Sequence, residues 1–247
     1  PQADVDLRQA LRSRSLAKLH TALKRRNVNR ELMAQNAAKG AGMLMLAVSM
    51  GEVPVFQCLA KEIRTRLGTP LLAKQLRYED DEEVPLVFYA AKSTPWMFEA
   101  VRKMVKDTIG VVGLAEQLRH QCANGANVLM KASNSPGVFA DVWELSRRMG
   151  CLDELREEYD KKGKNYVLHA AEAGNPAIFQ KISSDEEPDV YTLFSATDDK
   201  GWNGFMYAAR GRGLHSTTFL RKLFEICDAQ PVEPEQVKEQ LTRVADD

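Results

Sequence analysis

The sequence has no long apolar segment. Its longest apolar cluster, residues 43–48, is far shorter than the roughly 20 residues that a membrane-spanning helix needs, so no membrane span is expected. The N-terminus also lacks the apolar region and cleavage site of a secretory signal. Because the sequence begins at Pro1 rather than Met, a presequence could have been removed. The prediction is therefore an intracellular protein, of the cytoplasm or of an organelle interior.

Histidine and cysteine are scarce, and neither occurs in a recognised catalytic or metal-binding motif. The four histidines are His20, His120, His169 and His215, and the four cysteines are Cys58, Cys122, Cys151 and Cys227. No cysteines form a C-x-x-C pair or a zinc-ligand spacing. The cysteines fall on or beside expected apolar helix faces, which predicts buried free thiols and favours a reducing compartment. We expect no metal, no cofactor and no catalytic residues, and hence no enzymatic activity.

The chain also lacks net charge, but its charges are unevenly distributed. Residues 1–77 hold fourteen Lys and Arg against five Asp and Glu, whereas residues 79–83 and 185–187 are acidic runs. The tail, 228–247, holds six acids and two bases. The N-terminal region contains a basic patch made up of Arg12, Arg14, Lys24, Arg25 and Arg26. Such a patch attracts phosphate, but no interleaved aromatic residues are present to stack on bases, so nucleic-acid binding is not expected.

What the chain does contain is a repeat. An alanine recurs at intervals of 37 to 43 residues, at Ala10, Ala47, Ala90, Ala132, Ala170 and Ala208. An apolar residue lies three positions before each one, at Leu7, Leu44, Val87, Leu129, Val167 and Phe205. Seven positions before the last five alanines stand Gly40, Glu83, Gly125, Gly163 and Gly201. A fixed period of this size is typical of stacked helical repeats.

Each copy predicts a short helix, a turn and a longer helix. The clearest pair covers residues 43–49 and 54–67, and prolines occupy the expected first turn of the second helices at Pro54, Pro95, Pro136 and Pro176. In the first copy the apolar stripes change phase near 13–15, which predicts a helix break with Ser15 as N-cap. Additional short helices are expected at 71–77, 114–120 and 152–159. A loop with at most a turn of helix is expected between residues 182 and 199, and a final helix near 233–245.

The copies at 160–182 and 198–224 resemble ankyrin repeats. That family has a D-x-x-G-x-T-P-L-H-x-A-A segment, a Gly-containing link and a second helix. The matching residues are Asp160, Gly163, Val167, Ala170, Ala171 and Gly174 in one copy, and Asp198, Gly201, Phe205, Ala208 and Ala209 in the other. The Thr-Pro pair is missing, and Asn127, Asn165 and Asn203 occupy the Thr position. An Asn there can still bond to local backbone groups.

The expected fold is therefore all-α, a curved α-solenoid of about six ankyrin-like helix-turn-helix repeats with short turn fingers. Residues 1–39 form an N-terminal capping repeat and linker, 40–227 the array, and 228–247 a capping helix and acidic tail. The repeats of the array lie near 40–78, 83–121, 125–159, 163–197 and 201–227. Pentatricopeptide-like and HEAT-like repeats are the competing helical-pair architectures.

The resemblance implies binding through the turn tips and the exposed face of the first helices. Those positions are Lys161, Lys162, Lys164, Glu172, Asp199, Lys200, Trp202 and Arg210. Trp202 follows Gly201 in a polar turn, where it could anchor a partner or pack on the neighbouring turn. Trp96 and Trp143 fall on apolar stripes of second helices and are expected in the core.

The predicted function is a non-catalytic protein–protein interaction module, a scaffold or assembly subunit that binds one or more proteins of a larger complex. The alternative is an RNA-associated helical-repeat protein of the pentatricopeptide-like or HEAT-like kind. A third possibility is a specificity subunit attached to an enzyme.

Overall fold

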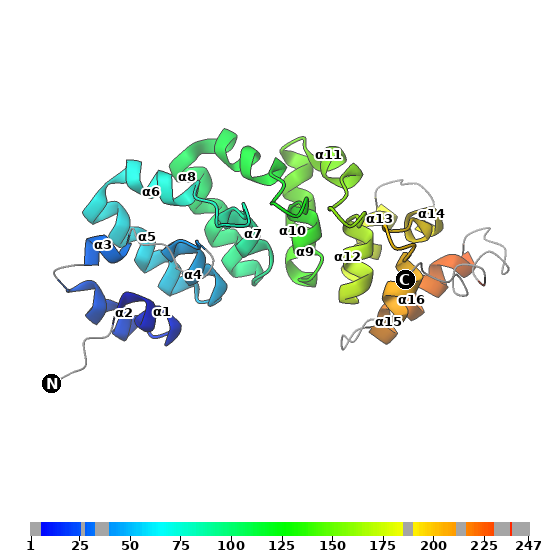
Figure 1. Ribbon diagram of the computed structural model, residues 1–247, viewed down its shortest axis with the longest axis horizontal. Helices are drawn as coiled ribbons and strands as arrows, with labels where there is room; N and C mark the ends of the chain where they lie inside the picture. Colours follow the sequence, from blue (N-terminus) through cyan, green and yellow to red (C-terminus); the bar gives the residue numbers. More distant parts are fainter. Residues whose placement is uncertain are drawn as a thin grey trace. The chain divides into compact units, whose positions relative to one another are not determined.

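The protein is all-α, as expected. The computed structural model describes residues 6–25, 28–32, 40–184, 190–210, 216–229 and 238. Within these residues there is no strand, only two isolated bridges, between Glu79 and Pro85 and between Thr197 and Asn203. The chain divides into two compact units, residues 1–123 and 124–247 (Figure 1). The expected organisation into repeats and caps stays a prediction.

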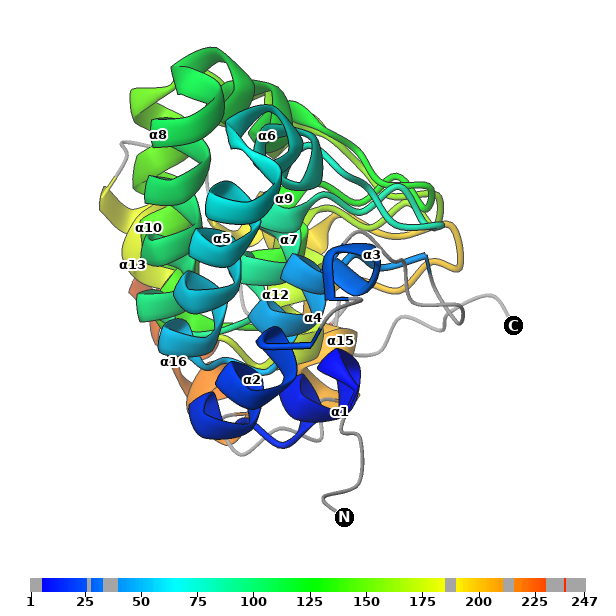
Figure 2. The ribbon, with the colours of Figure 1, turned by 90° about the vertical axis from the view of Figure 1, so that its left-hand side faces the viewer.

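The first unit is a succession of packed helices. In chain order they are α1 (Leu7–Arg12), α2 (Leu16–Leu23), α3 (Val28–Leu32), α4 (Met43–Ser49), α5 (Val53–Leu67), α6 (Thr69–Leu76), α7 (Leu86–Ala91) and α8 (Pro95–Arg119). Short α4 packs on α5, and short α7 packs on α8. The two short helices also pack on each other, while α5, α6 and α8 lie side by side (Figure 2).

The second unit follows the same plan. Its helices are α9 (Val128–Ala132), α10 (Pro136–Arg148), α11 (Leu152–Glu157), α12 (Tyr166–Ala173), α13 (Ala177–Ser184), α14 (Val190–Ser195), α15 (Gly204–Arg210) and α16 (Ser216–Ala229). The short helices α9, α12 and α15 pack in succession, α9 on α12 and α12 on α15. The second helices of two copies, α10 and α13, also pack on each other.

The recurring alanines lie where short helices meet. All six are fully buried, as are the apolar residues three positions before them. A methyl side chain permits close approach of adjacent helices, because a close-packed interior leaves no room for a larger group. Large apolar residues of the second helices, such as Phe56 and Phe139, complete the core.

The residues seven positions before these alanines share one backbone conformation. Gly40, Gly125, Gly163 and Gly201 have φ between 63° and 79°, and Glu83 adopts φ 58° at the equivalent place. At Gly163 a Cβ would lie 2.9 Å from the amide nitrogen of Asp199, so the next turn also requires glycine there.

The expected helix caps are confirmed. The side chains of Asn127, Asn165 and Asn203 accept hydrogen bonds from backbone amides three residues later, at 3.0, 2.9 and 2.9 Å. Ser15 caps α2 in the same way, through the amide of Lys18. Pro54, Pro95 and Pro136 lie in first turns, and Pro176 immediately precedes α13.

The structure corrects two expectations. Trp96, expected in the core, is 80% exposed, because Met97 and Phe98 carry the buried stripe of α8 and Trp96 points away from it. The 182–199 connection contains helix α14 rather than a loop with one turn. Phe194 of this helix is buried between Phe179 and Phe219, with ring centroids 5.5 and 5.8 Å away. The helix thus places Phe194 in an aromatic cluster with Phe179 and Phe219.

Other helix ends are close to the expected ones. Helix α2 begins directly after its N-cap Ser15 and ends at Leu23. The predicted extra helix at 114–120 is the second half of α8, which Gly110 interrupts with φ 81°. The predicted helix at 233–245 lies outside the described residues, apart from Lys238.

Candidate binding surface

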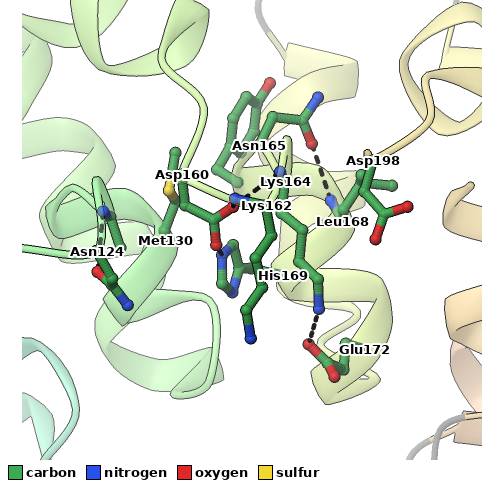
Figure 3. A network of polar contacts seen from close by, with 12 residues as sticks. Asn124, Met130, Asp160, Lys162, Lys164, Asn165, Leu168, His169, Glu172 and Asp198 are labelled. Carbon is green, nitrogen blue, oxygen red and sulfur yellow. Dashed lines mark hydrogen bonds and ion pairs between the residues drawn. The ribbon is translucent and has the colours of Figure 1, made fainter. Parts of the chain in front are cut away.

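An aspartate anchors the turn that precedes α12. One carboxylate oxygen of Asp160 accepts the amides of Lys162 and Lys164, both at 2.9 Å, and the other accepts Nε2–H of His169 at 3.0 Å (Figure 3). His169 is therefore a hydrogen-bonding residue of this turn. Both oxygens of the carboxylate are thus occupied by donors from the chain itself.

The same arrangement occurs at two other turns. Asp198, before α15, accepts the amides of Lys200 and Trp202 and the hydroxyl of Tyr207, the last at 2.6 Å. In the first unit, Asp80 accepts the amides of Glu82 and Val84 and the hydroxyl of Tyr89, also at 2.6 Å. The aromatic donor always lies nine residues after the aspartate. Sequence reasoning found Asp160 and Asp198 but missed this spacing, which was available as a signal.

The electrostatics of these turns favour fixed charge states. Burial raises the pKa of Asp160, but hydrogen bonds from His169 and from the amides of Lys164 and Lys162 outweigh it and lower the pKa to about 2. Burial, followed by the hydrogen bond to Asp198, raises the pKa of Tyr207. At neutral pH Asp160 is therefore an ionised acceptor and Tyr207 a protonated donor.

Adjacent turns of the second unit are joined through their backbones. The amide of Lys161 donates to the carbonyl of Asn124 at 2.9 Å, and the amide of Asp199 donates to the carbonyl of Lys162 at 3.0 Å. We call the exposed residues 161–162 and 199–200 the tip row. The bond between Asp199 and Lys162 joins its two turns, and the bond between Lys161 and Asn124 joins the first of them to the preceding turn.

The predicted contact residues occupy different depths. Exposed side chains are Lys161, Lys162, Glu172, Asp199, Lys200 and Arg210. Lys164 is only 9% exposed, and its ammonium lies 2.9 Å from Glu172 and 4.2 Å from the centroid of the Tyr207 ring. Lys164 therefore links α12 to α15. The family resemblance implied an exposed Lys164, but the structure buries it.

Trp202 is half-buried beside the tip row. Its ring lies 5.5 Å from that of Tyr207, and the guanidinium of Arg210 lies 4.9 Å from its centroid. The indole thus packs within the chain and also keeps part of its surface exposed. Tyr207 and Arg210 belong to α15, so the indole packs on the helix that follows it and not on the neighbouring turn. Its role as an anchor for a partner stays a prediction.

The N-terminal basic patch is only partly open. Arg12, Arg14 and Lys24 are exposed, whereas Arg25 is half-buried and lies 3.2 Å from Glu31. Arg26 lies outside the described residues. The patch therefore offers three exposed cations in the described part of the chain.

Metal binding, membrane insertion and thiol chemistry are three further functions that depend on particular side chains. Among the described residues, no group of three His, Cys, Asp or Glu side chains could hold a metal ion. None of the described helices is both long and apolar enough to cross a membrane. Cys122 and Cys151 are buried free thiols as expected, Cys58 is half-buried, and the side chain of Cys227 lies outside the described residues.

Comparison with known proteins gives a fold neighbour but no family. No protein-family model and no curated protein matches the chain. A chain in the solved complex of the predatory endopeptidase Bd0816 from Bdellovibrio bacteriovorus with the immunity protein Bd3460 is similar, with a TM-score of 0.51. The alignment covers 87% of this chain and 96% of that chain at 16% identity. At that identity, the likeness concerns the fold alone.

Proposed function

We propose that this chain is a non-catalytic protein-binding module whose partner contacts the tip row and Trp202. The observation that carries the proposal is that two turns with a fixed backbone display exposed lysines next to a partly exposed tryptophan. Asp160 and Asp198 fix the backbone of the two turns, which display Lys161, Lys162 and Lys200 beside a half-exposed tryptophan. Preorganised surfaces lose little conformational entropy on binding, and Trp and Arg are favoured anchors.

We further propose that the helix pairs form a divergent ankyrin-like α-solenoid of about six copies. The recurring buried alanines, the turns with positive φ and the Asn caps support this interpretation. Each property recurs at equivalent places in several copies. A repeat array would give a partner an extended surface built copy by copy.

The fold neighbour supports a role in protein binding. It comes from a complex in which an endopeptidase and an immunity protein associate. By analogy, an enzyme is one class of partner that this chain could hold within a larger assembly. The saturated carboxylates of Asp80, Asp160 and Asp198 fit a binding role better than a catalytic one, because their acceptor positions are used by the turns. Three free cysteines support a reducing, intracellular location.

A tagged pull-down tests the proposal. The full chain, Trp202→Ala and Trp96→Ala are compared in extracts of the source cell, with and without nuclease. Removal of a true anchor costs about 2 kcal/mol, so Trp202→Ala should lose most of the bound protein. Trp96→Ala removes a more exposed tryptophan from another surface and should retain the partner.

Two outcomes contradict the proposal. Loss of all bound material on nuclease treatment would favour the RNA-associated alternative. Equal binding by Trp202→Ala and the unmodified chain, with a lower melting temperature for the variant, would assign Trp202 to packing alone.

A further inference from the structure

We infer that the tip row recognises an acidic polypeptide segment of the partner. This inference rests on the proposed function and specifies its chemistry. Lys161, Lys162 and Lys200 are exposed, and they come from two turns joined by the hydrogen bond between Asp199 and Lys162. Three ammonium groups therefore project from a small, rigid part of the second unit.

The exposed side chains of the tip row are three lysines and one aspartate. Glu172 is 2.9 Å from Lys164, and Asp160 and Asp198 lie inside their turns with the hydrogen bonds described above. Asp199 is the exposed acid of the row itself. None of the three exposed lysines has an ion pair with another described residue. Three lysines against one aspartate leave the exposed side chains of the row with an excess of positive charge, while Asp160 and Asp198 are buried in the turns behind them.

The positive charge is specific to the tip row and does not follow from an aspartate-anchored turn as such. The equivalent turn of the first unit is anchored by Asp80 in the same way, yet it exposes Asp81, Glu82 and Glu83. The same turn geometry thus displays lysines in the second unit and acidic side chains in the first. An acidic segment would be attracted by the tip row and repelled by the first-unit turn, which gives specificity as well as attraction.

Trp202 indicates why the ligand is a polypeptide and not a nucleic acid. Base stacking needs an open aromatic face, whereas the indole already contacts Tyr207 and Arg210. The exposed part of the indole suits an apolar side chain next to the acids of a peptide.

Fluorescence anisotropy with the full chain tests the inference. The probe is a labelled peptide of about twelve residues that alternates glutamate with leucine or glycine, and a glutamine peptide and a single-stranded uridine RNA serve as comparisons. Measurements at about 50 mM and about 200 mM salt report the electrostatic contribution. The glutamate peptide should bind more tightly than either comparison, and more weakly at the higher salt.

Two charge-reversal variants locate the binding site. The tip-row variant is Lys161→Glu/Lys162→Glu/Lys200→Glu, and the matched control is Arg12→Glu/Arg14→Glu/Lys24→Glu in the N-terminal patch. All six side chains are exposed, so both variants should fold. Tip-row reversal should weaken binding about tenfold or more and the control about threefold or less. Replacement of the same three lysines by glutamine should give an intermediate loss.

The inference is overturned if the control variant loses as much affinity as the tip-row variant. It is also overturned if the glutamine peptide binds equally well, if the RNA binds more tightly, or if the glutamate peptide does not bind. If capture of the partner in the pull-down depends on Trp202 and any of these peptide results is obtained, the inference is wrong and the proposed function is retained. If the chain binds the glutamate peptide selectively but captures no protein in the pull-down, the inference is supported and the proposed function is not.

Discussion

At the scale of single residues, the aspartates of the turns are the most consequential polar groups. Each accepts two backbone amides and one aromatic side-chain donor, so one carboxylate fixes both the turn and the helix that follows it. The donors differ, since Tyr89 and Tyr207 are phenols and His169 is an imidazole. The proposed binding surface therefore depends on carboxylates that are themselves buried.

Asp160→Asn should lower the free energy of unfolding at pH 7 by about 2 kcal/mol, because the hydrogen bonds it breaks or weakens are made to a charged acceptor. Urea denaturation measures the change. Asp153→Asn is the matched control, since the Asp153 side chain is 95% exposed and its substitution should change stability little. A loss as large in the control would remove the special role of Asp160.

The same aspartate predicts a dependence on acid. Its pKa is lowered from 3.8 to about 2 in the folded chain, so its ionised form stabilises the fold above about pH 4. This contribution should be lost as pH falls from about 4 towards 2, where the folded carboxylate becomes protonated. The difference in stability between the unmodified chain and Asp160→Asn should shrink over this window. A difference that stays constant down to pH 2 would contradict the assignment.

The asparagine caps give a second residue-scale prediction. Asn165→Ala and Asn203→Ala should each cost about 1 kcal/mol, because each leaves an amide of the first helical turn without its acceptor. Asn165→Ser keeps an acceptor and should remain close to the unmodified chain. Thermal unfolding of the three variants distinguishes loss of the cap from loss of the side chain.

At the scale of elements, the spacing between short helices depends on small side chains. Ala208 of α15 is fully buried, whereas the next residue, Ala209, is exposed. Both match the family pattern, but only one lies in the helix interface. The pattern alone does not separate them, since the neighbour that buries Ala208 comes from a different part of the chain.

Ala208→Leu should destabilise the protein by about 2 kcal/mol, because the close-packed interface cannot accept three more carbon atoms without strain. Ala209→Leu is the control on the same helix and should have little effect. Denaturant unfolding with equal slopes for both variants would make the comparison valid. Equal destabilisation by both would mean that α15 packs differently.

At the scale of the whole molecule, each unit owes its stability to contacts between successive helices. In the first unit, α4 and α7 pack on each other and on their own longer partners, whereas α1 and α2 begin the series. Helices at the end of such a series have neighbours on one side only. Their local unfolding should therefore cost less than that of interior helices.

Hydrogen exchange measures this gradient. Backbone amides of α1 and α2 should exchange faster than those of α4 and α7, because the terminal pair can open while the interior remains folded. Mass spectrometry of proteolytic fragments gives the required resolution. Identical protection throughout the unit would indicate a single cooperative transition and would count against the proposed repeat architecture.

The sequence by itself determined most of the helices, their caps and the recurring alanines, but not helix α14. These depend on periodicity, on proline and glycine stereochemistry and on hydrogen bonds that reach only a few residues, as at Ser15 and Asn165. The tertiary structure alone decided that Lys164 is buried, that Trp96 is exposed and that Phe194 of helix α14 is buried. The reason is that burial depends on side chains that the fold supplies from other helices, which no local pattern contains. The tertiary structure also decided which lysines remain exposed, and the proposed contact with an acidic polypeptide depends on those lysines.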